Sequence, residues 1–190
     1  MPFTLDQINQ ALGTITVTEA ERRYLLSYRE LLAHFAGFDP LTLHTFIVGS
    51  HLVYAWMPTM LTLYPTNDDY ANIIAVLNDV RHSQDISLEN LILLKSIVNH
   101  SLVGSSKLLH CLNPDHYAIW DSRVYRFIHN TQNQHQLNQP INYLAYLQNC
   151  REIVAQNGFP NIHAQINQMI GYPVSGYRAI EWVMYMNGGN

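Results

Sequence analysis

The most constraining feature of this 190-residue chain is a set of apolar residues that recur every three or four positions. Between Thr18 and Gly37, for example, Tyr24, Tyr28 and Leu31 follow this spacing. It matches the 3.6-residue turn of an α-helix, and threonine and glycine are residue types that begin and end helices. We find no internal repeat and no segment with the alternation of a strand. The sequence therefore predicts an all-α bundle of about nine or ten helices.

Helix caps and helix breakers place the boundaries between these elements. Asp39 and Pro40 are expected to begin a long apolar helix that runs to about Trp56. The polar run 130–139, rich in Asn and Gln, is expected to form an exposed loop. The remaining boundaries are Pro58 and Pro65 in an irregular stretch, Asn67 and Ser87 as N-caps, and Pro140 and Gly158 as the start and stop of one helix.

The composition is that of a globular protein, with 48% hydrophobic and 13% charged residues. We expect residues 1–190 to form one domain or two small helical lobes. The two cysteines, Cys111 and Cys150, are isolated, and no apolar run approaches the ~20 residues that span a bilayer. These features predict a cytoplasmic protein without a membrane segment. The histidine spacings lack the i, i+4 pairing of helical metal sites, so we expect no metal and no cofactor.

The charges are unevenly distributed along the chain. The net charge is −4, which argues against a general nucleic-acid binder, and residues 1–94 hold ten acids and four bases. Residues 95–130 are the one positive segment. They contain Lys95, Lys107, Arg123 and Arg126 against Asp115 and Asp121.

That positive segment includes a Gly/Ser stretch between two expected helices. We expect a helix over 88–99, a turn over 100–106 and a second helix over 107–112. A turn of this kind can point backbone N–H groups and a helix N-terminus at one phosphate. The alternative is a helical hairpin that only packs.

The next helix, expected over 122–128, begins after Asp121. Aspartate there can serve as an N-cap that accepts from the N–H groups of Arg123 or Val124. A carboxylate at a helix mouth can also stabilise a developing cation or orient a nucleophile. Lys107 lies fourteen residues earlier. If the two side chains share a cleft, a desolvated lysine can attack a sugar C1′ and form a Schiff base.

The segment 88–128 resembles the helix-hairpin-helix DNA glycosylases, particularly the 8-oxoguanine DNA glycosylase branch. The resemblance rests on the turn containing Gly104, on Lys107, on the proline-containing connector and on the tetrapeptide Asp121-Ser-Arg-Val. It implies a glycosylase-like fold, DNA repair activity and a DNA partner carrying a damaged or flipped base. Asp121 would be the catalytic carboxylate and Lys107 the Schiff-base nucleophile. The backbone of Gly104, Ser105 and Ser106 would bind phosphate, with Arg123 beside it.

A flipped base also needs aromatic side chains to stack on, and Trp120 and Tyr117 are the candidates nearest to Asp121. The segment departs from the family pattern in three respects: it lacks the second glycine, places Lys107 one residue out of register and has a shorter connector. A second hypothesis therefore keeps the fold without the chemistry, as a binding or interaction module. A third is a HEPN-like ribonuclease, since Arg123 and His129 fit the loose Arg-x5-His pattern of that family.

Overall fold

The computed structural model describes residues 2–57, 59–64 and 67–189, except for the side chains of Asn67 and Asp68. Over these ranges the chain forms ten α-helices and no strand, apart from one isolated antiparallel bridge between Leu63 and Val98. The helices are α1 (Leu5–Leu12), α2 (Glu19–Ala36), α3 (Leu43–Trp56), α4 (Asn67–Arg81), α5 (Leu88–Ile97), α6 (Leu102–Leu112), α7 (Ser122–His129), α8 (Pro140–Val154), α9 (Phe159–Ile170) and α10 (Gly176–Asn187). The predicted all-α bundle is confirmed.

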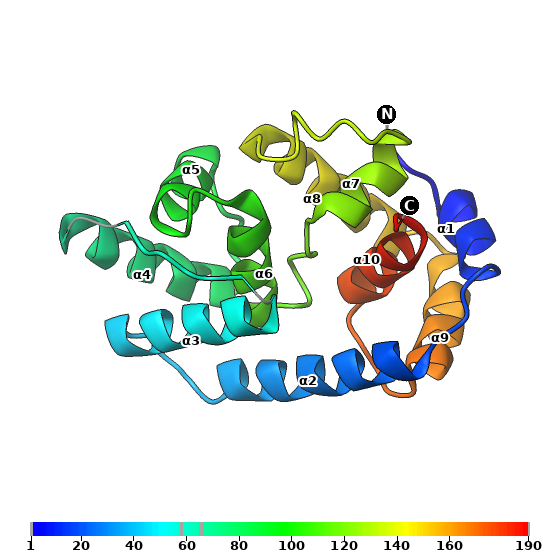
Figure 1. Ribbon diagram of the computed structural model, residues 1–190, viewed down its shortest axis with the longest axis horizontal. Coiled ribbons are helices and arrows are strands. Elements are labelled where there is room, and N and C mark those ends of the chain that lie inside the picture. The colour runs from blue at the N-terminus through cyan, green and yellow to red at the C-terminus, as the bar shows by residue number, and fades with distance from the viewer. Residues whose placement is uncertain (1, 58, 65–66, 190) are drawn as a thin grey trace.

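The helices fall into two groups that lie side by side, with α2 running beneath both (Figure 1). One group contains α3 to α6, and the other contains α1 and α7 to α10. The hydroxyl of Tyr28 on α2 bonds to His110 on α6, and the carbonyl of Leu25 accepts a hydrogen bond from Tyr172, which follows α9. Helix α2 is thus hydrogen-bonded to both groups of helices.

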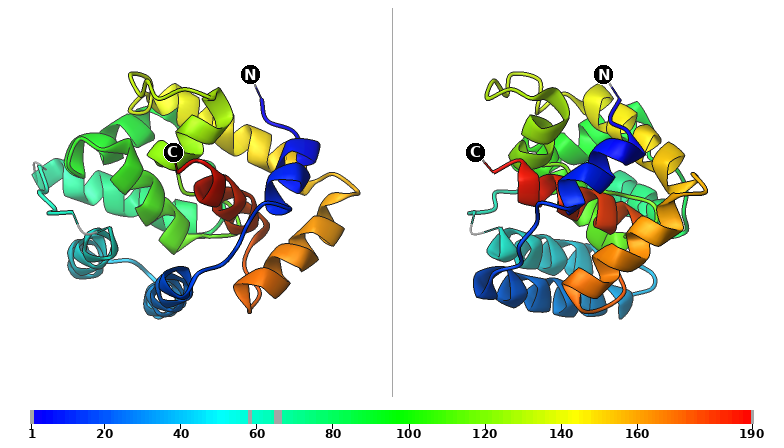
Figure 2. Two further views of the ribbon diagram at one scale, coloured as in Figure 1. Left: turned by 45° about the vertical axis from the view of Figure 1, so that its right-hand side comes forward. Right: turned by 90° about the vertical axis from the view of Figure 1, so that its right-hand side faces the viewer.

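Helix α10 forms the centre of the second group, enclosed by α1, α7, α8 and α9 (Figure 2). All of its residues from Tyr177 to Met184 are buried. The apolar residues among them belong to one hydrophobic cluster that runs through both groups of helices, whereas Arg178 and Glu181 are buried charged residues. No described helix combines the length and the apolar character needed to cross a membrane.

Local signals placed most helix ends correctly. Thr18, Ser87 and Asp121 are N-caps whose side chains accept hydrogen bonds from the first turn. The prediction for Asp39 and Pro40 was wrong, because α3 begins at Leu43 and Thr42 caps it through a reciprocal pair of bonds with Thr45. Pro58, Pro65 and the expected capping side chain of Asn67 lie outside the described residues.

The expected boundary of α6 also needs correction. The helix begins at Leu102, five residues before Lys107, and Ser101 caps it by accepting from the Gly104 N–H at 3.2 Å. Gly104, Ser105 and Ser106 are therefore helical and buried. The chain reverses earlier, where Asn99 and His100 have φ values of 54° and 50°. Tertiary packing has overridden the weak helix propensity of the Gly-Ser-Ser run.

Candidate functional site

The candidate site is centred on Lys107, which is half-buried on α6. Its Nζ lies 5.5 Å from the centre of the Trp56 ring at the end of α3. Burial lowers the pKa of Lys107, and the carboxylates of Asp121 and then Glu181 act in the opposite direction. Lys107 and Asp121 are thus close enough to interact electrostatically in a poorly solvated environment.

Asp121 is the N-cap residue at the start of α7. The carboxylate is 8% exposed, and its Oδ1 accepts from the N–H groups of Arg123 at 2.9 Å and of Val124 at 3.0 Å. The N-cap prediction is therefore confirmed with both expected donors. Because both bonds use Oδ1, the cap fixes the orientation of the carboxylate while leaving Oδ2 out of it.

The side chain of Ser106, next to Lys107, links the two segments that carry Lys107 and Asp121. The buried hydroxyl of Ser106 accepts from the Trp120 N–H at 3.0 Å and shares its one proton between the Trp120 carbonyl at 3.1 Å and the Val103 carbonyl at 2.9 Å. Ser106 precedes Lys107, and Trp120 precedes Asp121. The contact therefore binds the connector to α6 through the residues that directly precede Lys107 and Asp121.

Aromatic rings from three helices line the site, and sequence reasoning did not assign them to it. Tyr24 on α2 stacks on Trp56 with ring centres 4.6 Å apart, and lies parallel to Tyr185 on α10 with centres 6.1 Å apart. The Arg123 guanidinium lies 4.5 Å from the Tyr185 ring centre. Trp56, Tyr24 and Tyr185 thus form a half-buried aromatic row, with Lys107 at one end and Arg123 at the other. No sequence signal links rings so distant along the chain.

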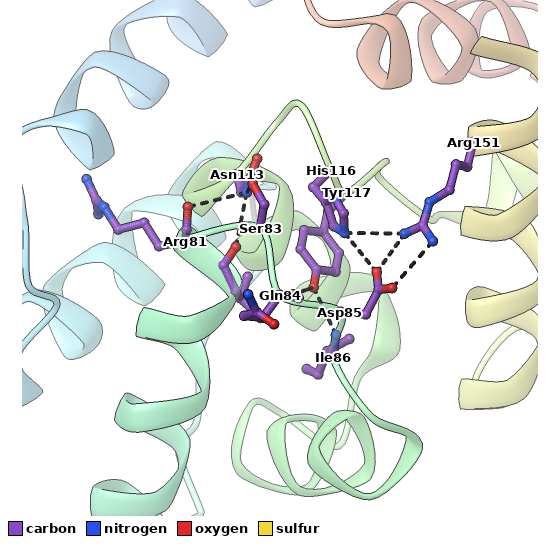
Figure 3. Close-up of polar contacts among 10 residues, drawn as sticks. Arg81, Ser83, Gln84, Asp85, Ile86, Asn113, His116, Tyr117 and Arg151 are labelled. Atoms are coloured by element: carbon purple, nitrogen blue, oxygen red, sulfur yellow. Dashed lines mark hydrogen bonds and ion pairs between the residues drawn. The ribbon is translucent and has the colours of Figure 1, made fainter. Parts of the chain in front are cut away.

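The two aromatic residues named from the sequence are part of the core instead. Trp120 and Tyr117 are each 1% exposed. The indole N–H of Trp120 donates to the Leu137 carbonyl, whereas the Tyr117 hydroxyl accepts from the Ile86 N–H and donates to the Gln84 carbonyl (Figure 3). These bonds stabilise the segments that connect the helices. Both rings are therefore core residues and do not offer a stacking surface next to Lys107.

Near Tyr117, Figure 3 shows a separate polar cluster that secures the connection between α4 and α5. Asp85 lies between His116 and Arg151, at 2.8 Å and 2.6 Å. Its carboxylate is exposed, and its pKa is lowered first by the hydrogen bond from Arg151. The cluster joins three segments of the chain, and this structural role is sufficient to explain it.

The Gly/Ser stretch does not form the expected turn with free N–H groups. The N–H of Gly104 bonds to Ser101, and the N–H of Leu102 donates to the Asn138 side chain at 2.9 Å. The Asn138 amide also donates to the His100 carbonyl. The hydroxyls of Ser105 and Ser106 bond to backbone carbonyls. The polar groups at the start of α6 are therefore hydrogen-bonded within the chain, partly to Asn138 of the polar loop.

The Arg-x5-His pair does not converge. Residues six apart on an α-helix point in different directions, and here Arg123 lies against Tyr185 whereas His129 contacts Tyr125. The described residues also contain no group of three or more His, Cys, Asp or Glu arranged to hold a metal ion.

Comparison with known proteins identifies no relative of this chain. No family model matches the chain, and no curated protein or solved structure matches it either. The functional reading therefore rests on the site itself.

Proposed function

We propose that this chain is a glycosylase-like protein that recognises or excises a flipped, damaged base in DNA, with α5, α6 and the start of α7 acting as its helix-hairpin-helix unit. The observation that carries the proposal is the burial of Lys107 together with the electrostatic influence of Asp121 on its amine. An amine whose pKa is lowered by burial is a better nucleophile at neutral pH than a solvated lysine. The carboxylate of Asp121, oriented by its cap, suits the stabilisation of a cationic sugar.

In the proposed reaction the Lys107 amine attacks C1′ of the damaged nucleotide. The new C–N bond forms as the glycosidic bond breaks, and the bonding electron pair leaves with the base, which then takes a proton from water. Transfer of a proton from the new C–N nitrogen to O4′ opens the sugar ring and leaves an imine. Asp121 stabilises the positive charge that develops on the sugar during the first step.

The aromatic row provides a surface on which the extruded base can stack. Base stacking on aromatic side chains contributes roughly 1–3 kcal/mol per base and does not depend on sequence. Tyr24, Trp56 and Tyr185 are half-buried and lie between the two cations Lys107 and Arg123. We assign the stacking role to these rings, in place of Trp120 and Tyr117.

Borohydride trapping tests the proposal directly, because hydride reduces the imine to a stable amine that joins protein to DNA. Wild-type protein is incubated with duplexes that contain an abasic site or 8-oxoguanine, and covalent adducts are resolved on a denaturing gel. We expect an adduct with wild type and none with Lys107→Gln. Lys95→Gln is the matched control and should keep the adduct, because Lys95 bonds to the Asn138 carbonyl away from Asp121.

The other outcomes separate the alternatives. Base release without an adduct would make water the nucleophile and leave Asp121 as the essential residue. An adduct that survives Lys107→Gln would exclude the assigned amine. Absence of both adduct and base release, over a panel of lesions in DNA and RNA, would refute the enzyme and favour the binding module.

A further inference from the structure

A pocket of about 310 Å³ lies between the N-terminal segment, α7 and α8. The described residues that line it do not include Lys107, Asp121 or any ring of the aromatic row. Its volume is at the lower end of the range for small-molecule pockets, roughly 300–1,000 Å³. Such pockets combine mostly apolar walls with a few polar groups that orient the ligand. The lining of this pocket has that composition.

Three aromatic rings from separate segments of the chain form the floor of the pocket. Phe3, Trp120 and Tyr146 line it, and each is at most 5% exposed. The centre of the Tyr146 ring lies 6.0 Å from that of Phe3 and 5.0 Å from that of Trp120. The indole N–H of Trp120 and the hydroxyl of Tyr146 each donate to a backbone carbonyl. The N–H of Phe3 donates to the Asn149 side chain at 2.9 Å, so all three residues are fixed in place before a ligand binds.

The polar groups of the pocket offer both donors and acceptors. His129, Asn142 and Asn149 belong to the lining. Oδ1 of Asn149 accepts from Phe3, and Nδ2 of Asn142 donates to the Gln136 carbonyl. Among the contacts of the described residues, Nδ2 of Asn149, Oδ1 of Asn142 and the His129 ring nitrogens make no hydrogen bond. A ligand that both donates and accepts can therefore bond to this set.

The lining is uncharged at neutral pH. None of the described residues around the pocket is Asp, Glu, Lys or Arg. Burial lowers the pKa of His129, so its imidazole is neutral. Phe3 and His129 also line an adjoining cavity of about 650 Å³, whose described lining is equally free of these four residue types. An ion would lose its hydration here without gaining a partner of opposite charge, so the pocket favours a neutral molecule.

We propose that this pocket binds a small, planar, neutral heterocycle that carries both hydrogen-bond donors and acceptors, with the size and chemistry of adenine. A flat ring packs favourably against other rings in offset or edge-to-face arrangements, and the floor supplies three of them. Because hydrogen bonds already fix this floor, binding needs little further ordering of the protein. The site is separate from Lys107 and Asp121, and the assignment does not depend on the proposed function.

Titration with adenine, followed by NMR of the indole N–H groups, tests the assignment. The chain contains three tryptophans, and of these only Trp120 is among the residues that line the pocket. With the three indole signals assigned, we expect that of Trp120 to shift and to saturate, with a Kd on the order of 1 mM or tighter. The signals of Trp56 and Trp182 should barely move. Absence of a saturable shift of the Trp120 signal would overturn the proposal.

Three probes of nearly the same shape test the chemical class. Benzamide is neutral with a donor and an acceptor, benzoate is an anion and benzamidine is a cation. We expect benzamide to bind, and the two ions to bind weaker by roughly tenfold or more. His129→Phe keeps a ring beside Tyr125 and removes the ring nitrogens, so it should weaken the binding of adenine and benzamide several-fold. Equal binding of the neutral and charged probes would refute the assigned class.

A blocked pocket provides the last control. Ala145 lines the pocket from an exposed position on α8, so Ala145→Leu should fill the space without disturbing the core. We expect this variant to bind adenine weaker by roughly tenfold or more. Ala71→Leu makes the same change at an exposed position on α4 and should bind as wild type does. Urea unfolding checks that both variants keep the wild-type fold. Adenine binding that survives Ala145→Leu unchanged would place the ligand elsewhere on the protein.

Discussion

The hydroxyl of Ser106 contacts both backbone polar groups of Trp120: it accepts from the N–H at 3.0 Å and shares its one proton between the Trp120 carbonyl at 3.1 Å and the Val103 carbonyl at 2.9 Å. Ser106 and Trp120 are both buried, so water is not available to replace the bonds between them. The contact joins the residue before Lys107 to the residue before Asp121. The geometry of the proposed site therefore depends on a serine that itself carries no chemistry.

Ser106→Ala is expected to destabilise the fold by about 1–3 kcal/mol, the usual cost of leaving buried polar groups unpaired. Urea unfolding measures the loss. Ser105→Ala is the matched control, since Ser105 is equally buried but bonds only to the Ser101 carbonyl within its own helix. Alanine also favours the helix there, so the control should change stability by less than about 0.5 kcal/mol. Equal losses in the two variants would show that the contact with Trp120 contributes nothing.

Gly104 has a packing role that the neighbouring sequence did not predict. A Cβ at this position would overlap with the hydroxyl and ring of Tyr54 on α3. Gly104→Ala should therefore be destabilising by about 1–2 kcal/mol, the cost of overpacking less the gain in helix propensity. Thermal unfolding measures the change.

Two comparisons isolate this contact. Gly13→Ala should be close to neutral, because its nearest neighbour would be the Gln10 carbonyl at 3.5 Å. The double variant Tyr54→Leu/Gly104→Ala should lose less than the sum of the single losses. Strict additivity would mean that the two residues do not constrain each other.

Asp121→Asn separates the structural role of this residue from the proposed chemical one. Asparagine caps a helix about as well as aspartate, so the free energy of unfolding should barely change, whereas Asp121→Ala should lose about 0.5–2 kcal/mol. Base release and adduct formation should be abolished in the Asn variant, because the carboxylate charge is gone. Full activity in Asp121→Asn would remove the catalytic role while leaving the cap intact.

His110 should make the stability of the protein depend on pH. It is fully buried, and its Nδ1 must carry the proton because it faces the Tyr117 carbonyl, so Nε2 accepts from the Tyr28 hydroxyl. Burial lowers the pKa of His110 from 6.5 to about 3. Between these values the unfolded chain binds a proton that the folded chain does not, so stability is lost as the pH falls.

The measurement compares wild type with His110→Gln by urea unfolding at several pH values. Below pH 6.5 the stability advantage of wild type over the variant should shrink by about 1.4 kcal/mol per pH unit, until about pH 3. Glu181 has the opposite dependence in wild type, but it is present in both proteins and cancels in the difference. A difference that stays constant between pH 6.5 and pH 3 would show that His110 binds its proton equally in the folded and unfolded chains.

DNA binding, where it occurs, should depend only mildly on salt. Near the site the cations are few, and the Arg126 side chain is already bonded to the Gly188 carbonyl. With about two or three phosphate contacts, the slope of log K against log salt should be roughly −2 to −3 for a duplex. Titrations of a lesion-containing duplex at several salt concentrations measure it. A much steeper slope would mean that another basic surface contacts the DNA.

The sequence by itself determined the helical class and most helix ends. The spacing of Tyr24, Tyr28 and Leu31 and the caps at Thr18 and Asp121 are local features, and their hydrogen bonds close within one turn of the chain. Such signals do not depend on what the helix packs against. They were misleading at Gly104, where a residue that favours turns lies inside a helix because Tyr54 packs on it.

Only the tertiary structure decided which side chains form the site. Trp120 lies beside Asp121 in the sequence, yet its ring is in the core, whereas Trp56, Tyr24 and Tyr185 come together from three different helices. Glu181, a charged residue, is buried because α10 is enclosed by the helices around it. These contacts arise from the burial of apolar surface over the whole chain, which is not directional and leaves no local pattern in the sequence.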